Sequence, residues 1–209
     1  MKKSNNITII DYKCGNLFSL IRVLEKLNCK ITISNKFNDI IKADKILLPG
    51  VGSFKIGYEN LKKDNLNKAI VDFKKKGNFL LGICLGMQLL LTESHEFGLH
   101  KGLNLIPGKV KKLIGDDNVK IPHVGWNSTN ISTNKYFGLM DNIKNFSYFY
   151  FTHSFAGKTD DIKDTLATTH HGRNNFSSII NKENAVGFQF HPEKSGLVGE
   201  KLINNFLSL

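Results

Sequence analysis

The sequence predicts an α/β protein with three layers, in which a mostly parallel central sheet carries helices on both faces beside a smaller antiparallel section. In the first half, short apolar segments alternate with amphipathic segments across short connections, as in a parallel sheet covered on both faces. In the second half the apolar segments are shorter and follow one another like hairpins. A chain of 209 residues without repeats or a Pro/Gly/Ser-rich linker is expected to form one domain over residues 1–209.

Each element of the first half follows from its hydrophobic pattern. The run ITIIDY (7–12) predicts a buried strand, and a one-sided apolar spacing predicts a helix through Leu17, Leu20, Ile21, Leu24 and Leu27. The following patterns predict strands in KITIS (30–34), KILLPG (45–50) and NFLLGI (78–83), a long helix from Gly57 to Lys76 and a helix in LGMQLLLTESHE (85–96).

The second half is richer in predicted strands. Hairpin-like patterns occur in GKVKKLI (108–114), FSYFYFTHSF (146–155), DTLATTH (164–170) and NFSSIIN (175–181). An apolar strand, AVGFQF (185–190), follows them, and the segment 199–209 predicts a closing helix.

Composition limits the classes of function. A formal net charge of +11 suits a partner such as nucleic acid, but the lysines are scattered, without an arginine-rich helix or interleaved aromatic residues. A basic nucleic-acid-binding module is therefore disfavoured, although it stays as an alternative. No apolar run approaches the ~18 residues of a membrane span, and no signal peptide is expected at the N-terminus. Three cysteines without a CxxC pair suit a reducing compartment, so we expect a cytoplasmic protein that does not bind membranes.

Cys84 lies where the predicted strand 78–83 passes into the next helix, within the pattern Gly82-x-Cys84-x-Gly86. A free cysteine in an apolar run is most often a small buried core residue. Glycines on both sides of this junction instead indicate a nucleophile elbow, a tight turn that exposes one side chain at the carboxyl edge of the sheet. The helix start favours a thiolate there, and the Leu85 N–H can bind an oxyanion.

A cysteine nucleophile needs an acid/base partner, and His191 is the best candidate among seven histidines. It ends an apolar strand and precedes proline, which favours extended backbone. Residues i and i+2 of an extended segment project to one side, so Glu193 can orient the His191 ring. His123 and His153 are more simply structural or interfacial. The pattern predicts a Cys84–His191–Glu193 set with no metal or cofactor.

The glycine-rich loop PGVGSF follows the predicted strand KILLPG. It lacks the GK[ST] ending of a phosphate-binding P-loop. We therefore expect a flexible strip beside Cys84, in which backbone N–H groups of Gly50, Val51 and Gly52 form the second side of an oxyanion hole.

Taken together, these motifs resemble class I (triad-type) glutamine amidotransferases over nearly the whole chain. The resemblance is carried by the segments IDYxxGN, PGVGSF, CLGMQ, IPHVGWN, HSF and QFHPEKS. In detail they are similar to the glutaminase subunits of imidazole glycerol phosphate synthases, from histidine biosynthesis. The resemblance implies the flavodoxin-like class I fold.

The resemblance also implies roles for residues of the matching motifs. Cys84 would attack the side-chain amide of L-glutamine, and His191, oriented by Glu193, would protonate the departing ammonia and then activate water. The amino-acid end of the substrate would be recognised by Gln88 and Glu96, with backbone at Ser154 and Phe155.

The resemblance implies a partner as well. The ammonia acceptor would be a synthase subunit, a (β/α)₈-barrel cyclase in the histidine pathway, bound as a heterodimer. The sequence departs from the family where Lys13 stands in place of a usual glycine, in a loop expected to face the partner. An alternative is therefore a paralogous glutaminase that feeds a sugar amidotransferase for surface polysaccharide or flagellin glycan synthesis. A peptidase with an elbow cysteine would not be expected to carry both QFHPEKS and CLGMQ.

Overall fold

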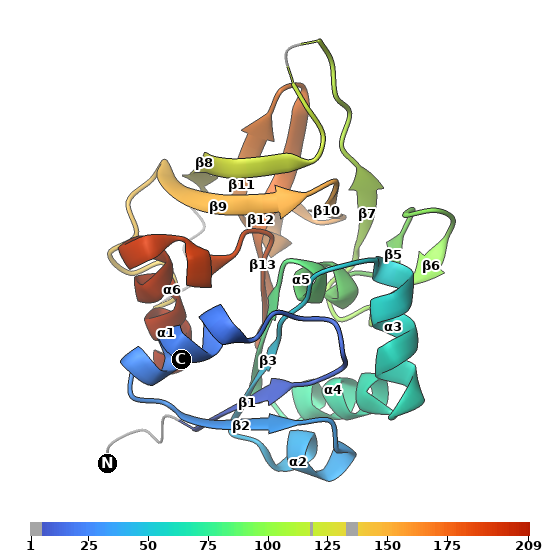
Figure 1. The fold of residues 1–209 in the computed structure, drawn as a ribbon, viewed down its shortest axis with the longest axis vertical. Helices are drawn as coiled ribbons and strands as arrows, with labels where there is room; N and C mark the ends of the chain where they lie inside the picture. Colours follow the sequence, from blue (N-terminus) through green and yellow to red (C-terminus); the bar gives the residue numbers. More distant parts are fainter. Residues whose placement is uncertain (1–5, 118, 133–137) are drawn as a thin grey trace.

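The computed structural model describes residues 6–117, 119–132 and 138–209. Within these residues, the larger sheet has nine strands in the order β2-β1-β3-β4-β13-β12-β11-β8-β9 (Figure 1). The first five run parallel to one another and are β2 (Lys30–Ser34), β1 (Asn6–Ile10), β3 (Lys45–Leu48), β4 (Phe79–Ile83) and β13 (Ala185–Phe188). Their carboxyl ends meet at one edge, where ligands bind in open α/β sheets.

The other four strands extend this sheet with antiparallel pairing. They are β12 (Asn174–Lys182), β11 (Thr165–His171), β8 (His123–Ile131) and β9 (Ser147–His153). A smaller sheet has the order β10-β7-β5-β6 and consists of β10 (Phe155–Thr159), β7 (Gly108–Lys112), β5 (Glu93–Ser94) and β6 (His100–Lys101). The predicted α/β class with a smaller, largely antiparallel section is confirmed.

Helices cover both faces of the parallel strands (Figure 1). One face carries α1 (Phe18–Lys26) and α6 (Gly196–Ser208), and the other carries α2 (Phe37–Lys42), α3 (Phe54–Lys63), α4 (Leu66–Lys75) and α5 (Leu85–Leu90). The chain has a hydrophobic core cluster on each face of the sheet, and strand β4 contributes side chains to both. Leu81 and Ile83 join the first cluster and Leu80 joins the second, because alternate side chains of a strand point to opposite faces.

Three predicted boundaries are wrong. The long helix Gly57–Lys76 is two helices, since Asn65 adopts φ 55°, a left-handed conformation that cannot continue a right-handed helix. The helix predicted over 85–96 ends at Leu90, because Leu91 is extended and Glu93–Ser94 pair with β7 and β6. The strand predicted over 146–155 is divided at Ser154 between β9 and β10. Strand β8 and helix α2 had no predicted counterpart.

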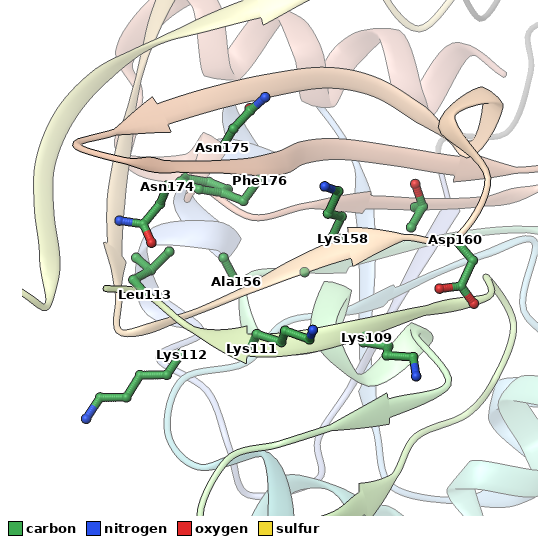
Figure 2. Close-up of a pocket in the computed structure, with 12 residues that line it drawn as sticks. Lys109, Lys111, Lys112, Leu113, Ala156, Lys158, Asp160, Asn174, Asn175 and Phe176 are labelled. Atoms are coloured by element: carbon green, nitrogen blue, oxygen red, sulfur yellow. The ribbon is translucent and has the colours of Figure 1, made fainter. Parts of the chain in front are cut away.

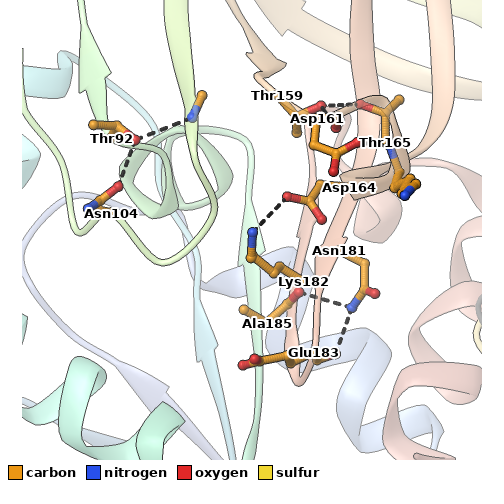
Figure 3. Close-up of polar contacts among 12 residues, drawn as sticks. Thr92, Asn104, Thr159, Asp161, Asp164, Thr165, Asn181, Lys182, Glu183 and Ala185 are labelled. Atoms are coloured by element: carbon orange, nitrogen blue, oxygen red, sulfur yellow. Dashed lines mark hydrogen bonds and ion pairs between the residues drawn. The ribbon is translucent and has the colours of Figure 1, made fainter.

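The hairpin between β12 and β13 is fixed by side chains at its turn (Figure 3). The Asn181 side-chain amide donates to the carbonyls of Glu183 and Ala185, at 2.9 and 3.1 Å. Lys182 Nζ pairs with Asp164 Oδ2 at 3.2 Å, in the short 3₁₀ helix η1 (Ile162–Asp164). These contacts hold the start of β13, the strand that leads directly to the predicted catalytic histidine.

None of the helices in the described part of the chain combines the length and apolar character that a bilayer crossing requires.

Candidate active site

Cys84 occupies the turn between β4 and α5, with φ 53° and ψ −108°. Two glycines allow this tight turn, because a β-carbon at either position would clash with neighbouring backbone. A β-carbon at Gly82 would lie 2.7 Å from the backbone of Gly86, and one at Gly86 would overlap the Leu48 carbonyl oxygen. The Cys84 N–H donates to the Phe188 carbonyl at 2.7 Å, which ties the turn to β13. The sequence pattern therefore produces a strained strand-to-helix turn with the thiol at the sheet edge.

His191 and Glu193 are in direct contact. His191 Nδ1 lies 2.7 Å from Glu193 Oε1, and both side chains are buried. The local geometry differs from the extended segment that the sequence predicts: His191 is extended, but Pro192–Lys194 form a 3₁₀ turn, η2. The Ser195 hydroxyl donates to the His191 carbonyl at 2.6 Å and so closes this turn.

The imidazole of His191 is held in its charged form. Burial opposes the charge, but the hydrogen bonds and charges of Cys84 and Glu193 outweigh burial and raise the pKa of His191 to about 10. Its Nε2 atom is buried and has no aligned hydrogen bond within the described residues. Because Nδ1 faces Glu193, Nε2 is the ring atom that can exchange a proton with a substrate.

A cleft of about 410 Å³ opens above Cys84. The predicted residues Gln88, Glu96, Ser154 and Phe155 line this cleft together with Val51, Gly52, Cys84 and Leu85. His191 does not line it; with Gly50 and Glu193 it borders a smaller adjoining cavity. The structure therefore brings the predicted residues to one sheet edge from elements far apart in the sequence.

Polar side chains in the cleft are fixed by hydrogen bonds. Gln88 Nε2 donates to the Phe155 carbonyl at 2.8 Å and to Gln189 Oε1 at 3.2 Å. Glu96 is buried and accepts the Phe54 N–H on Oε2 at 2.6 Å. Glu96 enters the cleft from the segment after β5 rather than from the helix that the sequence predicts.

Sequence reasoning missed several residues of this site. Phe97, Pro122, Thr152 and His153 also line the cleft. Gln189 is fully buried, and its amide nitrogen lies 3.9 Å from the Cys84 sulfur. A single amide inside the apolar run AVGFQF was the available signal, because a buried amide requires hydrogen-bond partners.

Two of the four predicted oxyanion donors are engaged elsewhere in this structure. The Leu85 N–H donates to the Gly50 carbonyl at 3.3 Å, and the Val51 N–H donates to the Cys14 carbonyl at 3.4 Å. Gly52 adopts φ 112°, which favours glycine. Val51, Gly52 and Leu85 line the cleft together with Cys84, but the Gly50–Val51 peptide presents a carbonyl, and not an N–H, to the helix start.

Lys13 adopts a left-handed backbone conformation. Its φ is 63°, where glycine is free of strain. The Asp11 carboxylate compensates by accepting the Lys13 backbone N–H at 3.1 Å and its Nζ at 2.7 Å.

Three histidines form a cluster beside the cleft, in which His123 and His153 are buried and His171 is half-buried, and His153 also lines the cleft. His123 stacks on His171 with ring centroids 4.0 Å apart, and His123 Nδ1 lies 3.2 Å from His153 Nε2. Burial and the neighbouring rings lower the pKa of His123 to about 4 and that of His153 to about 3. These two rings are therefore neutral at pH 7 and pack like other core groups.

A second cavity, of about 460 Å³, lies between β7, β10 and β12 (Figure 2). It is lined by Lys109, Lys111, Lys112 and Lys158, and by none of the predicted site residues. In the described residues, no group of three or more His, Cys, Asp or Glu side chains could hold a metal ion.

The fold and this site define a class of protein. The family "Glutamine amidotransferase class-I" matches residues 8–209, and the chain belongs to that family. Its fold also matches a structure described as "Crystal structure of glutamine amidotransferase", with a TM-score of 0.72 at 14% identity, covering 97% of each chain.

Relatives with higher sequence identity point to one group of proteins within this family. The chain is 43% identical to the "Imidazole glycerol phosphate synthase subunit HisH" of Chlorobium chlorochromatii, covering 97% of this chain and 100% of the relative. It is 46% identical to the protein of the same name from Methanocaldococcus jannaschii, covering 97% and 99%.

Proposed function

We propose that this chain is the glutaminase subunit of an imidazole glycerol phosphate synthase. It hydrolyses L-glutamine to glutamate and ammonia, and it supplies the ammonia to a cyclase subunit that makes imidazole glycerol phosphate and AICAR in histidine biosynthesis. The buried His191–Glu193 pair beside the Cys84 cleft is the observation that carries this proposal. Full-length similarity to synthase subunits supports the pathway. Residues 1–209 would act as one cytoplasmic domain.

The geometry supports a two-step reaction. The Cys84 thiolate attacks the amide carbon of glutamine, and the His191 imidazolium gives its Nε2 proton to the departing nitrogen. The carbon–nitrogen bond breaks, ammonia leaves, and a glutamyl thioester remains. His191, now neutral, takes a proton from water, whose oxygen attacks the thioester carbon. The carbon–sulfur bond breaks, which releases glutamate and restores the Cys84 thiolate and the His191 imidazolium. Glu193 stabilises the charged ring and fixes its orientation.

Substrate recognition is assigned to the polar side of the cleft. The Glu96 carboxylate attracts the α-ammonium group of glutamine, and Gln88 with the backbone of Ser154 and Phe155 recognises the rest of the amino-acid end. Burial of Glu96 strengthens the charge interaction, because little water remains to screen it.

The resting arrangement favours low activity without a partner. Stabilising the tetrahedral oxyanion requires N–H donors aimed at it, whereas the Leu85 and Val51 N–H groups bind Gly50 and Cys14. Rotation of the Gly50–Val51 peptide would release Leu85 and turn the Val51 N–H towards Cys84. We infer that partner binding favours the rotated form.

The partner would dock on the exposed face of β8 and β9. Val124, Trp126 and Tyr148 are each more than half exposed there, and large exposed apolar side chains mark protein interfaces. The same face reaches the active site, because Thr152 lines the cleft and Lys194 of η2 lies over the Tyr150 ring. We infer a heterodimer with a (β/α)₈-barrel cyclase and no nucleic-acid or membrane partner.

Two experiments test the proposal. A glutamine-analogue alkylator followed by peptide mapping should label Cys84, and should leave Cys14 and Cys29 unlabelled. A pull-down from native extract should recover the cyclase, and the cyclase should raise glutaminase turnover. Undiminished turnover of the isolated chain would contradict partner activation, and recovery of a sugar amidotransferase would reassign the acceptor.

A further inference from the structure

Phe97 lies at the edge of the cleft above Cys84 with its ring in solvent. It lines the cleft, and its 87% exposure is the highest of the large apolar side chains in the described residues. Single exposed apolar residues are ordinary on a protein surface, but this one borders the site where the substrate would bind. Its ring has apolar surface left to bury, and burial against a ligand is favourable.

The backbone presents this ring at a cost. Phe97 has φ 52° and Gly98 has φ 124°. This left-handed region suits glycine, whereas a bulky side chain is strained there. Burial of the ring does not compensate for the strain, because the ring is exposed. Strained residues are concentrated at binding and catalytic sites, so the conformation of Phe97 is a second observation that points to a role in the cleft.

The segment before Phe97 is firmly held. The Glu96 N–H donates to Ser94 Oγ at 3.2 Å, and the Glu96 carboxylate accepts the Phe54 N–H at 2.6 Å. The Phe97 ring meets the Phe155 ring edge to face, with centroids 6.0 Å apart. The ring therefore stands between the carboxylate assigned to the α-ammonium group of glutamine and the start of β10, whose backbone is assigned to the same end of the substrate.

We propose that Phe97 is a substrate-contact residue, whose ring covers the α-amino end of bound glutamine where Glu96 holds the ammonium group. This inference rests on the proposed glutaminase function and adds a residue to its substrate site. An aromatic face attracts an ammonium group. The ring also keeps water from the Glu96 carboxylate, which strengthens the charge interaction. Glutamine in turn would bury the ring that the free protein leaves exposed.

The test is Phe97→Ala in the complex with the synthase partner. KM for glutamine should rise about 10-fold, because contact with the ring is lost. The value of kcat should stay within about twofold of the parent, since the ring covers the end of glutamine remote from the reacting amide and acts on ground state and transition state alike. The melting temperature should not fall, because an exposed ring contributes little packing.

Two further variants make the test specific. Phe97→Tyr keeps an aromatic face and should keep the parental KM within about twofold. Leu99→Ala is the matched control, because Leu99 is an exposed apolar residue of the same segment that does not line the cleft. It should alter neither KM nor kcat. Calorimetric titration of glutamine into a Cys84→Ala complex, with and without Phe97→Ala, should show the same loss of affinity without turnover.

The outcomes separate the claims. An unchanged KM for Phe97→Ala overturns the inference, and so does an equal rise for Leu99→Ala. A raised KM that returns to the parental value at saturating partner would assign Phe97 to docking and would overturn it as well. A wild-type complex without glutaminase activity instead contradicts the proposed function itself, whatever the Phe97 variants do.

Discussion

Glu193 contacts His191 from two residues away, and this contact determines which ring nitrogen carries the mobile proton. With Oε1 on Nδ1 at 2.7 Å, the proton available to a substrate is the one on Nε2. Such an orienting carboxylate also stabilises the imidazolium, so its effect is larger in the transition state than in substrate binding.

Glu193→Gln should therefore lower kcat by about 100-fold or more. KM for glutamine should change little, because Glu193 does not line the substrate cleft. Steady-state kinetics of the complex measure both values. Glu183→Gln, at an exposed glutamate paired with Lys74, is the control and should leave both parameters unchanged. A large rise in KM for Glu193→Gln would show that this carboxylate binds substrate instead.

The buried histidines predict how stability depends on pH. The folded pKa values of His123 and His153 lie near 4 and 3, below the ordinary histidine value of 6.5. Between these folded pKa values and 6.5, the unfolded chain therefore binds more protons than the folded chain. The contribution of the neutral rings is complete above pH 6.5 and is lost as pH falls towards 4 and 3.

Each histidine should add about 1.4 kcal/mol per pH unit to the slope of unfolding free energy below pH 6. Urea denaturation at several pH values should show a smaller slope for His123→Asn than for the parent. His170→Asn, at an exposed position, is the comparison and should keep the parental slope. Equal slopes for all three proteins would mean that His123 takes up a proton without unfolding.

At the scale of elements, the β4–α5 turn depends on two glycines. Gly86 approaches the Leu48 carbonyl so closely that a methyl group cannot fit without moving β3 or α5. The left-handed φ of Cys84 adds strain to the same turn. Packing of β3, β4 and β13 around the turn must compensate for that strain.

Gly86→Ala should lower the unfolding free energy by about 2 kcal/mol or more. It should also reduce labelling of Cys84 by a glutamine analogue, because the thiol would move from the cleft. Chemical denaturation and peptide mapping measure these effects. Gly15→Ala provides a milder control, since its β-carbon would meet the flexible end of Leu17 at 3.3 Å and Pro49 at an ordinary contact distance of 3.8 Å. Wild-type stability of Gly86→Ala would refute the close-packing explanation.

At the scale of the whole molecule, the sheet brings the cleft and an exposed apolar face together. The β8–β9 pair places Trp126 opposite Tyr150, and it presents Thr152 to the cleft. Lysines dominate the net charge of +11, but several of them are paired with carboxylates, including Lys26 with Glu200 and Lys109 with Glu93. An apolar docking face agrees better with a protein partner than with nucleic acid.

Trp126→Ala should weaken the heterodimer about 10- to 100-fold, because buried tryptophans are frequent interface hot spots. Alkylation of Cys84 in the isolated chain should be unaffected, since Trp126 lies outside the cleft. Ile162→Ala, at an exposed apolar residue on η1, should leave the affinity unchanged. Calorimetric titration of the partner measures both variants, and equal affinities would exclude the β8–β9 face as the docking surface.

The α/β class, the elbow at Cys84 and the contact of His191 with Glu193 could be predicted from the sequence, because alternation, glycine spacing and short-range geometry are encoded within a few residues. It did not determine the break at Asn65, where a left-handed residue divides two helices. Nor did it determine the end of α5 or the path of Glu96, since strand pairing with β7 overrides helical propensity there. Only the folded chain shows that Gln189 and His153 lie near the nucleophile and that the Leu85 and Val51 N–H groups are engaged. Those facts depend on which strands become neighbours, and burial and hydrogen bonding across the sheet edge select that arrangement.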